Sequence, residues 1–274
     1  MNPIQYEQNH KVIHPALCPF EYGYIDQYKD VVCNWHKHIE ILLVEQGSGF
    51  IQCGTKEYPL WEGDLFVINS EAIHHIYSKE GISFHFIIIK EHFCIENGID
   101  VKQVRFKEKI DDENTVCLFR LMATEIQDAK FQKKFPYLTK ARAAVLNLLS
   151  DLCTNHLLDN SENAMISSET EQHIKKAITY LNEHYTKPFH LETISDYLGI
   201  NKHYFSRIFK NQTGQTPLTY ANTLRCIHAE YALSNGMNVT EAAYDCGFES
   251  LAYFSRTYKS IRGISPTEFK KNLT

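Results

Sequence analysis

The chain has 274 residues, of which 43% are apolar and 22% charged, and its formal net charge at pH 7 is −5. That length allows two domains with separate cores, and the composition is typical of a soluble globular protein. No run of about 18 apolar residues and no basic-then-apolar leader occurs, so we expect neither a membrane span nor a secretory signal peptide. The 8 cysteines are scattered without a CxxC pair, which indicates reduced thiols in a cytoplasmic protein rather than a disulfide framework or a zinc finger.

Charge is distributed unevenly along the chain. Residues 171–274 carry a net charge of +3, and the remaining residues carry −8. A basic C-terminal third attached to an acidic body favours a polyanion-binding module joined to a sensor.

The N-terminal half has the pattern of a β domain. Residues 1–30 contain several prolines among aromatic and polar residues, which predicts an irregular arm or short edge strands. From Val31 onward, short β-branched and aromatic runs are broken by Gly, Asn, Pro and Asp turns, and further strands are expected at His75–Ser78 and Ile82–Ile89. Strands at this spacing predict an all-β sandwich or barrel.

The periodicity changes to that of helices after about Val104. Residues 114–130 and 137–158 are predicted helices. One side of the second helix carries an apolar stripe made of Leu138, Ala141, Val145, Leu148, Leu149 and Leu152. Such a stripe packs on the β domain or pairs with another chain, and the sequence leaves both readings open. Residues 159–168 are polar and aperiodic, which predicts a linker.

Beyond the linker, a fourteen-residue sequence motif occurs twice. Residues 204–217 are YFSRIFKNQTGQTP and residues 253–266 are YFSRTYKSIRGISP, offset by 49 positions throughout. This constant register indicates two copies of one structural unit. Apolar and polar positions in each copy follow helical spacing, so each copy is predicted to be a helix with one apolar and one polar face.

Each copy follows a short helix and a glycine turn, which is the outline of a helix-turn-helix whose second helix enters the major groove of DNA. The polar faces carry His203, Ser206, Arg207 and Lys210 in the first copy and Ala252, Ser255, Arg256 and Lys259 in the second. Arginine can donate two parallel hydrogen bonds to guanine, serine can reach a base edge or a phosphate, and lysine at a helix end can contact phosphates. The intervening helix spans about 25 Å, which suits two recognition helices in successive major grooves about 34 Å apart.

These motifs closely resemble the DNA-binding domain of the AraC/XylS family of transcription regulators, over about residues 170–272. The likeness includes the turn 243–248 and the connecting-helix residues Arg225, Ala229 and Leu233. It implies base contacts by His203, Ser206, Arg207, Ala252, Ser255 and Arg256. Two positions depart from the family pattern. His190 stands where such helices usually start with Ser or Thr, and Ala252 can offer only a methyl contact, so we expect the second copy to read less sequence than the first.

Residues 36–76 resemble the cupin-like sensor barrel that is common ahead of such DNA-binding domains. In metal-binding cupins one motif has His-x-His followed by Glu, and a second has Gly, Pro and His. By that likeness His36, His38 and His74 occupy the three histidine positions. Strand alternation would also place His36 and His38 on one face with Glu40. The family glutamate would fall at Leu42 or Leu43 instead, and Asn69 replaces the proline.

Three roles remain open for these histidines: a divalent metal site, the lining of an organic-ligand pocket, or plain structural packing. The candidate ligand-binding residues are Trp35, His36, His38, Glu40 and His74. The candidate metal ligands are His36, His38 and His74. Nearby aromatic side chains offer stacking surfaces of the kind that sugar sites use. We expect no cofactor.

The sequence thus predicts an α+β multidomain protein. A cupin-like β barrel with trailing helices (residues 1–158) would sense an effector and dimerise, and a linker (159–168) would join it to an all-α AraC-type DNA-binding domain (169–274). That domain would have helix-turn-helix motifs at 191–212 and 239–261 and a connecting helix at 217–234.

We expect an effector-responsive transcription activator of sugar or metabolite genes, without enzymatic activity. Its partners would be double-stranded DNA, a small-molecule effector such as a sugar, a second copy of the chain in a homodimer, and RNA polymerase. Two alternatives stay open. One is a metal-dependent cupin enzyme or metal sensor with a DNA-binding tail, and the other is a regulator that needs no small ligand.

Overall fold

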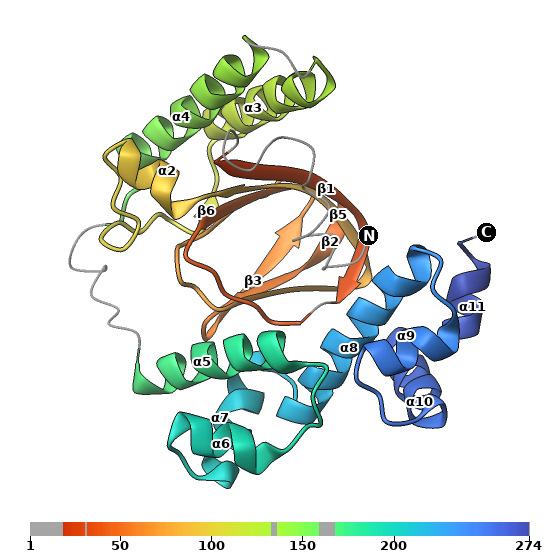
Figure 1. The fold of residues 1–274 in the computed structure, drawn as a ribbon. Coiled ribbons are helices and arrows are strands. Elements are labelled where there is room, and N and C mark those ends of the chain that lie inside the picture. Colours follow the sequence, from red (N-terminus) through yellow and green to blue (C-terminus); the bar gives the residue numbers. More distant parts are fainter. Residues whose placement is uncertain (1–18, 31, 133–135, 159–167, 274) are drawn as a thin grey trace. The chain divides into compact units, whose positions relative to one another are not determined.

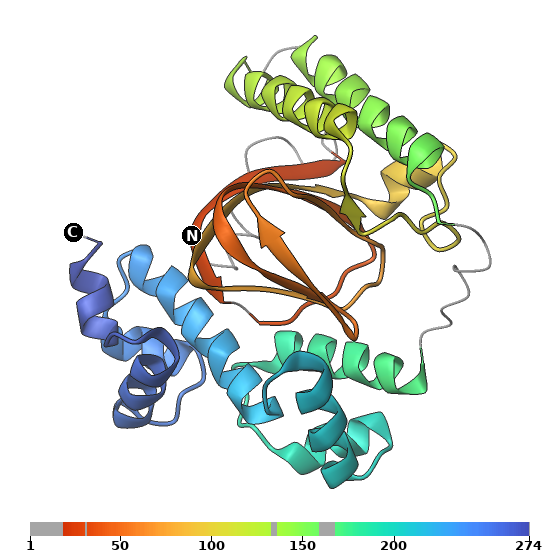
Figure 2. The same ribbon diagram turned by 180° about the vertical axis from the view of Figure 1, so that it is seen from behind.

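A computed structural model describes residues 19–30, 32–132, 136–158 and 168–273 (Figures 1 and 2). The chain divides into two compact units, a β domain that contains residues 19–30 and 35–158 and a helical domain that contains residues 168–273. The predicted α+β multidomain class is confirmed. Residues 1–18 of the expected arm and 159–167 of the expected linker lie outside the described residues. None of the described helices combines the length and the apolar character needed to cross a bilayer.

The β domain is built on a curved antiparallel sheet (Figure 1). Its strands are β1 (Phe20–Asp30), β2 (Ile39–Cys53), β3 (Lys56–Trp61), β4 (Leu65–Ile68), β5 (His74–Ile89) and β6 (Lys109–Ile110). The strand order is β1-β5-β2-β4-β6, and β3 pairs with β2 off this path. The long strands β2 and β5 form the spine of the sheet, because they pair from Ile39 opposite Ile89 to Cys53 opposite His74.

The pairing of β2 with β5 is irregular where Gly47 approaches Gly81. Its register shifts on either side of Gly47, which has a φ of +85°. A Cβ atom on Gly47 would lie 2.4 Å from the carbonyl oxygen of Gly81, so only glycine allows this close approach and this left-handed conformation. The two strands predicted at 75–78 and 82–89 are therefore one strand, β5, because the ladder with β2 resumes on both sides of the irregularity.

Three helices follow the strands that form most of this sheet. They are α2 (Glu91–Glu96), α3 (Glu113–Gln132) and α4 (Tyr137–Asn155). Five residues of the apolar stripe on α4 are fully buried in one core with strand residues such as Ile41 and Ile87: Ala141, Val145, Leu148, Leu149 and Leu152. Core packing is thus confirmed for these positions, and a dimer contact would need another surface of the helix pair.

The helical domain consists of two helix-turn-helix units and the helices around them. Its elements are α5 (Glu169–His184), α6 (Leu191–Leu198), α7 (Lys202–Thr213), α8 (Pro217–Ser234), α9 (Val239–Asp245), α10 (Leu251–Arg262) and α11 (Pro266–Lys271). The first unit is α6 and α7 with Gly199 at the turn, the second is α9 and α10 with Gly247 at the turn, and α8 connects them.

Side-chain caps define where the two longer helices of these units begin. The Asn201 side chain accepts a hydrogen bond from the backbone N–H of His203 at 2.8 Å, and Ser250 accepts one from Tyr253 at 3.2 Å. Such caps stabilise a helix by about 1 kcal/mol each. His190, at the start of α6, makes no side-chain capping bond, which agrees with its departure from Ser or Thr.

Candidate functional site

Helix α7 separates an apolar side from a polar side. Its buried side carries Phe205, Ile208 and Phe209. Its other side exposes His203, Arg207 and Lys210, with Ser206 half-buried beside them. The guanidinium of Arg207 lies 5.6 Å from the centre of the Tyr204 ring, so a cation–π contact helps to hold this arginine along the helix.

Helix α10 repeats the arrangement. Its buried side carries Phe254 and Tyr258. Its other side exposes Ala252, Arg256 and Lys259, with Ser255 half-buried. The helix is anchored on α8, because the Tyr258 hydroxyl donates to Glu230 at 3.0 Å and Arg262 forms an ion pair with the same carboxylate at 2.7 Å.

The cations on the two exposed faces differ from those that stabilise the fold. Lys202 pairs with Glu192 at 2.6 Å. Within the described part of the chain, by contrast, no carboxylate pairs with Arg207 or Arg256. Both guanidiniums are therefore available to an outside acceptor, and each presents the planar donor pair that guanine or a phosphate can accept.

The connecting helix α8 is tied to the turn that follows α5. From α8, Arg225 donates to the carbonyl oxygens of Tyr185 and Lys187, each at 2.7 Å. The same guanidinium lies 5.7 Å from the centre of the Phe248 ring in the second unit. Sequence comparison places Arg225 in the connecting helix, but nothing in the local sequence indicates that its partners are backbone carbonyls forty residues earlier in the chain.

The glycine turn of the second unit packs directly on the same segment. A Cβ atom on Gly247 would lie 2.3 Å from the carbonyl oxygen of Thr186, whereas a Cβ atom on Gly199 would meet nothing within 4 Å. The two turns are equivalent in sequence and in backbone conformation, with φ values of +82° and +68°. Only the second turn is held against backbone, and this contact fixes how the second unit lies on the turn that follows α5.

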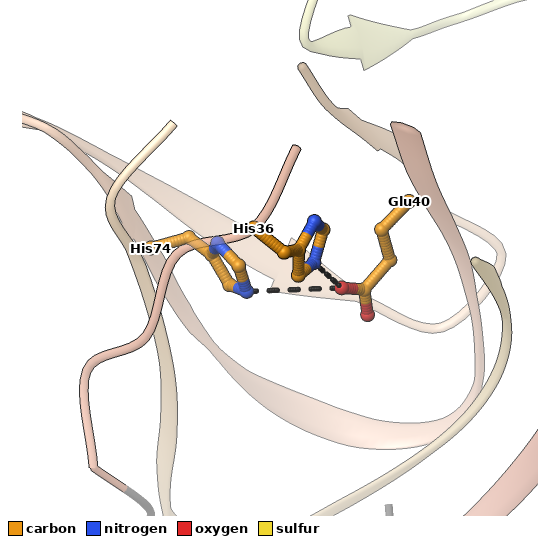
Figure 3. Close-up of side chains that lie close together, drawn as sticks. All are labelled: His36, Glu40 and His74. Carbon is orange, nitrogen blue, oxygen red and sulfur yellow. Dashed lines mark hydrogen bonds and ion pairs between the residues drawn. The ribbon is translucent and has the colours of Figure 1, made fainter. Parts of the chain in front are cut away.

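In the β domain the structure brings together three of the predicted ligand-binding residues. His36 precedes β2, Glu40 lies on β2 and His74 is the first residue of β5 (Figure 3). The Nε2 atom of His36 lies 3.0 Å from Glu40 Oε2, and the Nε2 atom of His74 lies 3.7 Å from the same oxygen. Glu40 is fully buried, and the two imidazoles are largely so.

Burial dominates the electrostatics of this cluster. It raises the pKa of Glu40 to about 8 and lowers that of His74 to about 4, since a charge is poorly solvated there. Burial, followed by the neighbouring imidazoles of His74 and His38, holds the pKa of His36 well below its usual value. Both imidazoles of the cluster are therefore neutral at pH 7.

His38 does not join the cluster, although the sequence pattern paired it with His36. Its Nδ1 accepts a hydrogen bond from the backbone N–H of Glu91 at 3.2 Å. The alternation argument does not apply, because residues 36–38 precede the first residue of β2, Ile39. Trp35, the remaining candidate, is half-buried one position before His36.

Asn69, which replaces the expected proline, has a structural role in the same domain. Its side-chain amide donates to the carbonyl oxygen of Phe106 at 2.9 Å and accepts from the N–H of Phe106 at 2.8 Å. These two bonds join the end of β4 to the segment that leads into β6. A proline could form neither bond.

Two family models match the chain. An AraC-like ligand binding domain matches residues 14–97, and a helix-turn-helix domain matches residues 194–272. The first covers most of the strands and the cluster of His36, Glu40 and His74, and the second covers both helix-turn-helix units.

Curated relatives match over most of their own length. The chain is 24% identical over 242 residues to the HTH-type transcriptional activator RhaS of Mannheimia succiniciproducens, covering 86% of this chain and 87% of the relative. It is 24% identical over 266 residues to the activator RhaR of Escherichia coli O1:K1 / APEC, covering 89% of each. An uncharacterized HTH-type regulator of Bacillus subtilis, YdeC, is 26% identical over 255 residues, with 87% and 85% covered.

A solved structure shares the fold. ToxT from Vibrio cholerae, crystallised with an unsaturated fatty acid, has a TM-score of 0.51 at 14% identity, covering 92% of this chain and 94% of that one. At this identity the likeness concerns the fold alone.

Proposed function

The chain belongs to the AraC family of transcriptional regulators and is a DNA-binding transcription regulator, and from this premise we propose that α7 and α10 read the base sequence of double-stranded DNA. The observation that carries this proposal is the repeated exposed face with an arginine that no carboxylate among the described residues holds. The proposed contacts are His203, Ser206, Arg207 and Lys210 on α7, and Ala252, Ser255, Arg256 and Lys259 on α10.

The connecting helix suits this use. Helix α8 has 18 residues, which corresponds to a length of about 27 Å at about 1.5 Å per residue. With a helix bundle at each end, such a spacer suits recognition helices in adjacent major grooves, about 34 Å apart on one face of the duplex. The ties of Arg225 and Gly247 to residues 185–187 favour a fixed spacing over a variable one.

The two recognition helices are not equivalent in this proposal. His203 offers ring nitrogens to a base edge at a position where Ala252 offers only a methyl group, which suits a thymine. Helix α7 therefore contributes more of the preference for particular bases. Helix α10 contributes binding affinity that depends less on the base sequence.

We further propose that a small-molecule effector binds the β domain and that the protein acts as an activator. The match to a ligand binding domain supports the first part, and the names of RhaS and RhaR support the second. The effector would act through its different affinity for two states of the protein, one of which binds DNA more tightly. A sugar is one candidate, with Trp35, His36, His38, Glu40 and His74 in its site. The further proposed partners are a second copy of the chain and RNA polymerase, in the cytoplasm.

A regulator is favoured over an enzyme because the relatives that match across the chain are transcription regulators. The alternative of a metal-dependent enzyme with a DNA-binding tail rested on the histidines of the β domain. Those histidines lie in a domain that matches a ligand binding family, where sensing is the simpler role.

The test begins with selection of bound duplexes from a random library by the full-length protein, which supplies a binding site. Affinity for that site is then measured by fluorescence anisotropy for the native protein and for Arg207→Ala. Loss of one bidentate base contact should weaken binding by about 1–3 kcal/mol and relax the preference at one base pair. Binding should also fall steeply with salt, because phosphate contacts release counterions.

Lys176→Ala is the matched control, since this exposed cation lies on α5 outside both repeats. It should bind the selected site nearly as well as the native protein and keep its base preference. An Arg207→Ala variant with unchanged affinity and unchanged base preference would show that α7 does not read the bases.

A further inference from the structure

The donor atoms of His36, Glu40 and His74 converge on one point (Figure 3). In His36 the Nδ1–H donates to the carbonyl oxygen of His38 at 3.1 Å, and in His74 the Nδ1–H donates to that of Ala72 at 3.0 Å. A neutral imidazole carries one proton, so each Nε2 is left with a lone pair. Both lone pairs are directed toward the Glu40 carboxyl group. Backbone carbonyls that fix a histidine tautomer in this way are typical supports of metal ligands.

Hydrogen bonding among these three side chains leaves the cluster incomplete. Two Nε2 lone pairs and an ionised carboxylate are all acceptors, so either a proton on Glu40 or a metal cation must lie between them. A proton on Glu40 Oε2 serves His36 at 3.0 Å but leaves His74 at 3.7 Å, beyond hydrogen-bond range. The other oxygen, Glu40 Oε1, is buried and has no hydrogen-bond partner among the described residues. A buried carboxylate oxygen without a partner is costly.

We propose that His36, Glu40 and His74 bind a divalent first-row transition metal ion. Metal–ligand bonds of about 2.1 Å set the ligand atoms of a tetrahedral site about 3.4 Å apart. The two nitrogen–oxygen distances of 3.0 and 3.7 Å lie on either side of that spacing. Two imidazoles and one carboxylate suit Zn²⁺, Fe²⁺ or Mn²⁺, whereas Mg²⁺ and Ca²⁺ prefer all-oxygen sites.

The proposed metal ligands differ from the three histidines that the sequence pattern indicates. Glu40 takes the place of His38, whose Nδ1 lone pair accepts from the Glu91 N–H, so its Nε2 carries the ring proton. Three protein ligands leave at least one coordination position open. An effector with an oxygen or nitrogen donor can occupy that position, which would couple metal and effector in one site of the β domain.

The experiment uses full-length protein freed of metal with a chelator and then titrated with Zn²⁺ by calorimetry and with Co²⁺ by visible absorption. We expect one equivalent per chain and the intense d–d bands of a tetrahedral Co²⁺ site. Glu40→Gln and His74→Gln each remove one ligand with little change of shape. Since loss of an outer-sphere partner alone costs about 10- to 100-fold in affinity, each should cost at least about 100-fold. His38→Gln, the matched control, should change affinity less than about threefold.

Zn²⁺ should also raise the melting temperature of the native protein and of His38→Gln, because the metal binds only the folded state. Mg²⁺ and Ca²⁺ should have no such effect. A native protein that takes up no Zn²⁺ or Co²⁺ overturns the proposal even if a variant fails to fold. So does an affinity that drops as much in His38→Gln as in Glu40→Gln.

The metal site is distinct from the proposed DNA-binding function, and separate measurements test metal binding and DNA binding. Affinity of the Glu40→Gln variant for the selected duplex is measured without metal, under the conditions used for the native protein. Loss of metal binding with DNA affinity intact supports the site and leaves the regulator function in place. Absence of metal binding in a native protein that binds DNA removes the metal site alone.

Discussion

Replacing either turn glycine of the helix-turn-helix units with alanine should have very different consequences. Gly199 and Gly247 occupy equivalent positions in the two units, and both have left-handed backbone, with φ values of +68° and +82°. Gly199→Ala adds a methyl group to open space, whereas Gly247→Ala adds one against the backbone of Thr186. The pair therefore separates the cost of the backbone conformation from the cost of the contact.

The conformational part is common to both variants. An alanine in the left-handed region costs about 1–2 kcal/mol, and the reduced freedom of the unfolded chain offsets about 0.4–1 kcal/mol of that. Gly199→Ala should therefore destabilise the helical domain by about 1 kcal/mol.

The contact adds a second cost at Gly247 only. The new Cβ atom would lie 2.3 Å from the carbonyl oxygen of Thr186 and 2.6 Å from its carbonyl carbon and its Cα. These are backbone atoms that Arg225 holds from either side through Tyr185 and Lys187. Forced displacement of packed groups costs about 1–3 kcal/mol, so Gly247→Ala should destabilise the domain by about 3 kcal/mol in total.

The measurement is urea-dependent hydrogen exchange read by mass spectrometry on peptides from α8 and α10. This readout follows the helical domain by itself, because a chain with two domains need not unfold in one transition. The refuting result is equal destabilisation by both alanines, within about 0.5 kcal/mol, a typical size for a neutral surface substitution. Residues 185–187 would then move aside freely, and the second unit would not be held by this contact.

Three further predictions concern other buried groups. Arg225→Met should destabilise the helical domain by about 2 kcal/mol in the same exchange assay, because the carbonyl of half-buried Tyr185 loses its donor. Asn69→Ala should cost the β domain about 2–4 kcal/mol, followed by tryptophan fluorescence in urea, because both backbone groups of Phe106 lose their partner. Burial lowers the pKa of His228 to about 4. The neutral imidazole therefore makes its full contribution to the free energy of unfolding above about pH 6.5, and this contribution is lost as pH falls toward 4. With partial solvent screening this amounts to about 1–2 kcal/mol, and His228→Gln should flatten the melting temperature between pH 7 and pH 5.

The helical domain and its DNA-facing residues follow from the sequence because their signals are local. Helical periodicity, an Asn or Ser cap and a glycine turn all act within a few residues, so each helix-turn-helix can be placed without knowing its neighbours. The repeat at an offset of 49 then identifies the exposed faces. Exposure of Arg207 and Arg256 follows from the same periodicity, because Phe205 and Phe254 occupy the buried side.

Other features depend on contacts between segments far apart in the chain. The stripe on α4 packs into the core of its own domain, and periodicity alone cannot distinguish this from pairing with a second chain. Likewise, the two turn glycines have the same local sequence role, yet Gly247 meets the backbone of Thr186 and Gly199 meets nothing. A pattern within one segment carries no information on which segment packs against it.

The histidines of the β domain show most clearly which features the sequence determines and which depend on the tertiary structure. The sequence by itself indicates Trp35, His36, His38, Glu40 and His74 as candidates, since these side-chain types and spacings are visible without a fold. Only the tertiary structure selected Glu40 over His38. The loop before β5, whose Glu71 N–H donates to the carbonyl oxygen of His36, brings His74 to 3.7 Å from Glu40, while the N–H of Glu91 occupies the lone pair of His38. Which side chains share a site is decided by contacts between segments far apart in the chain, a long-range property that local spacing does not encode.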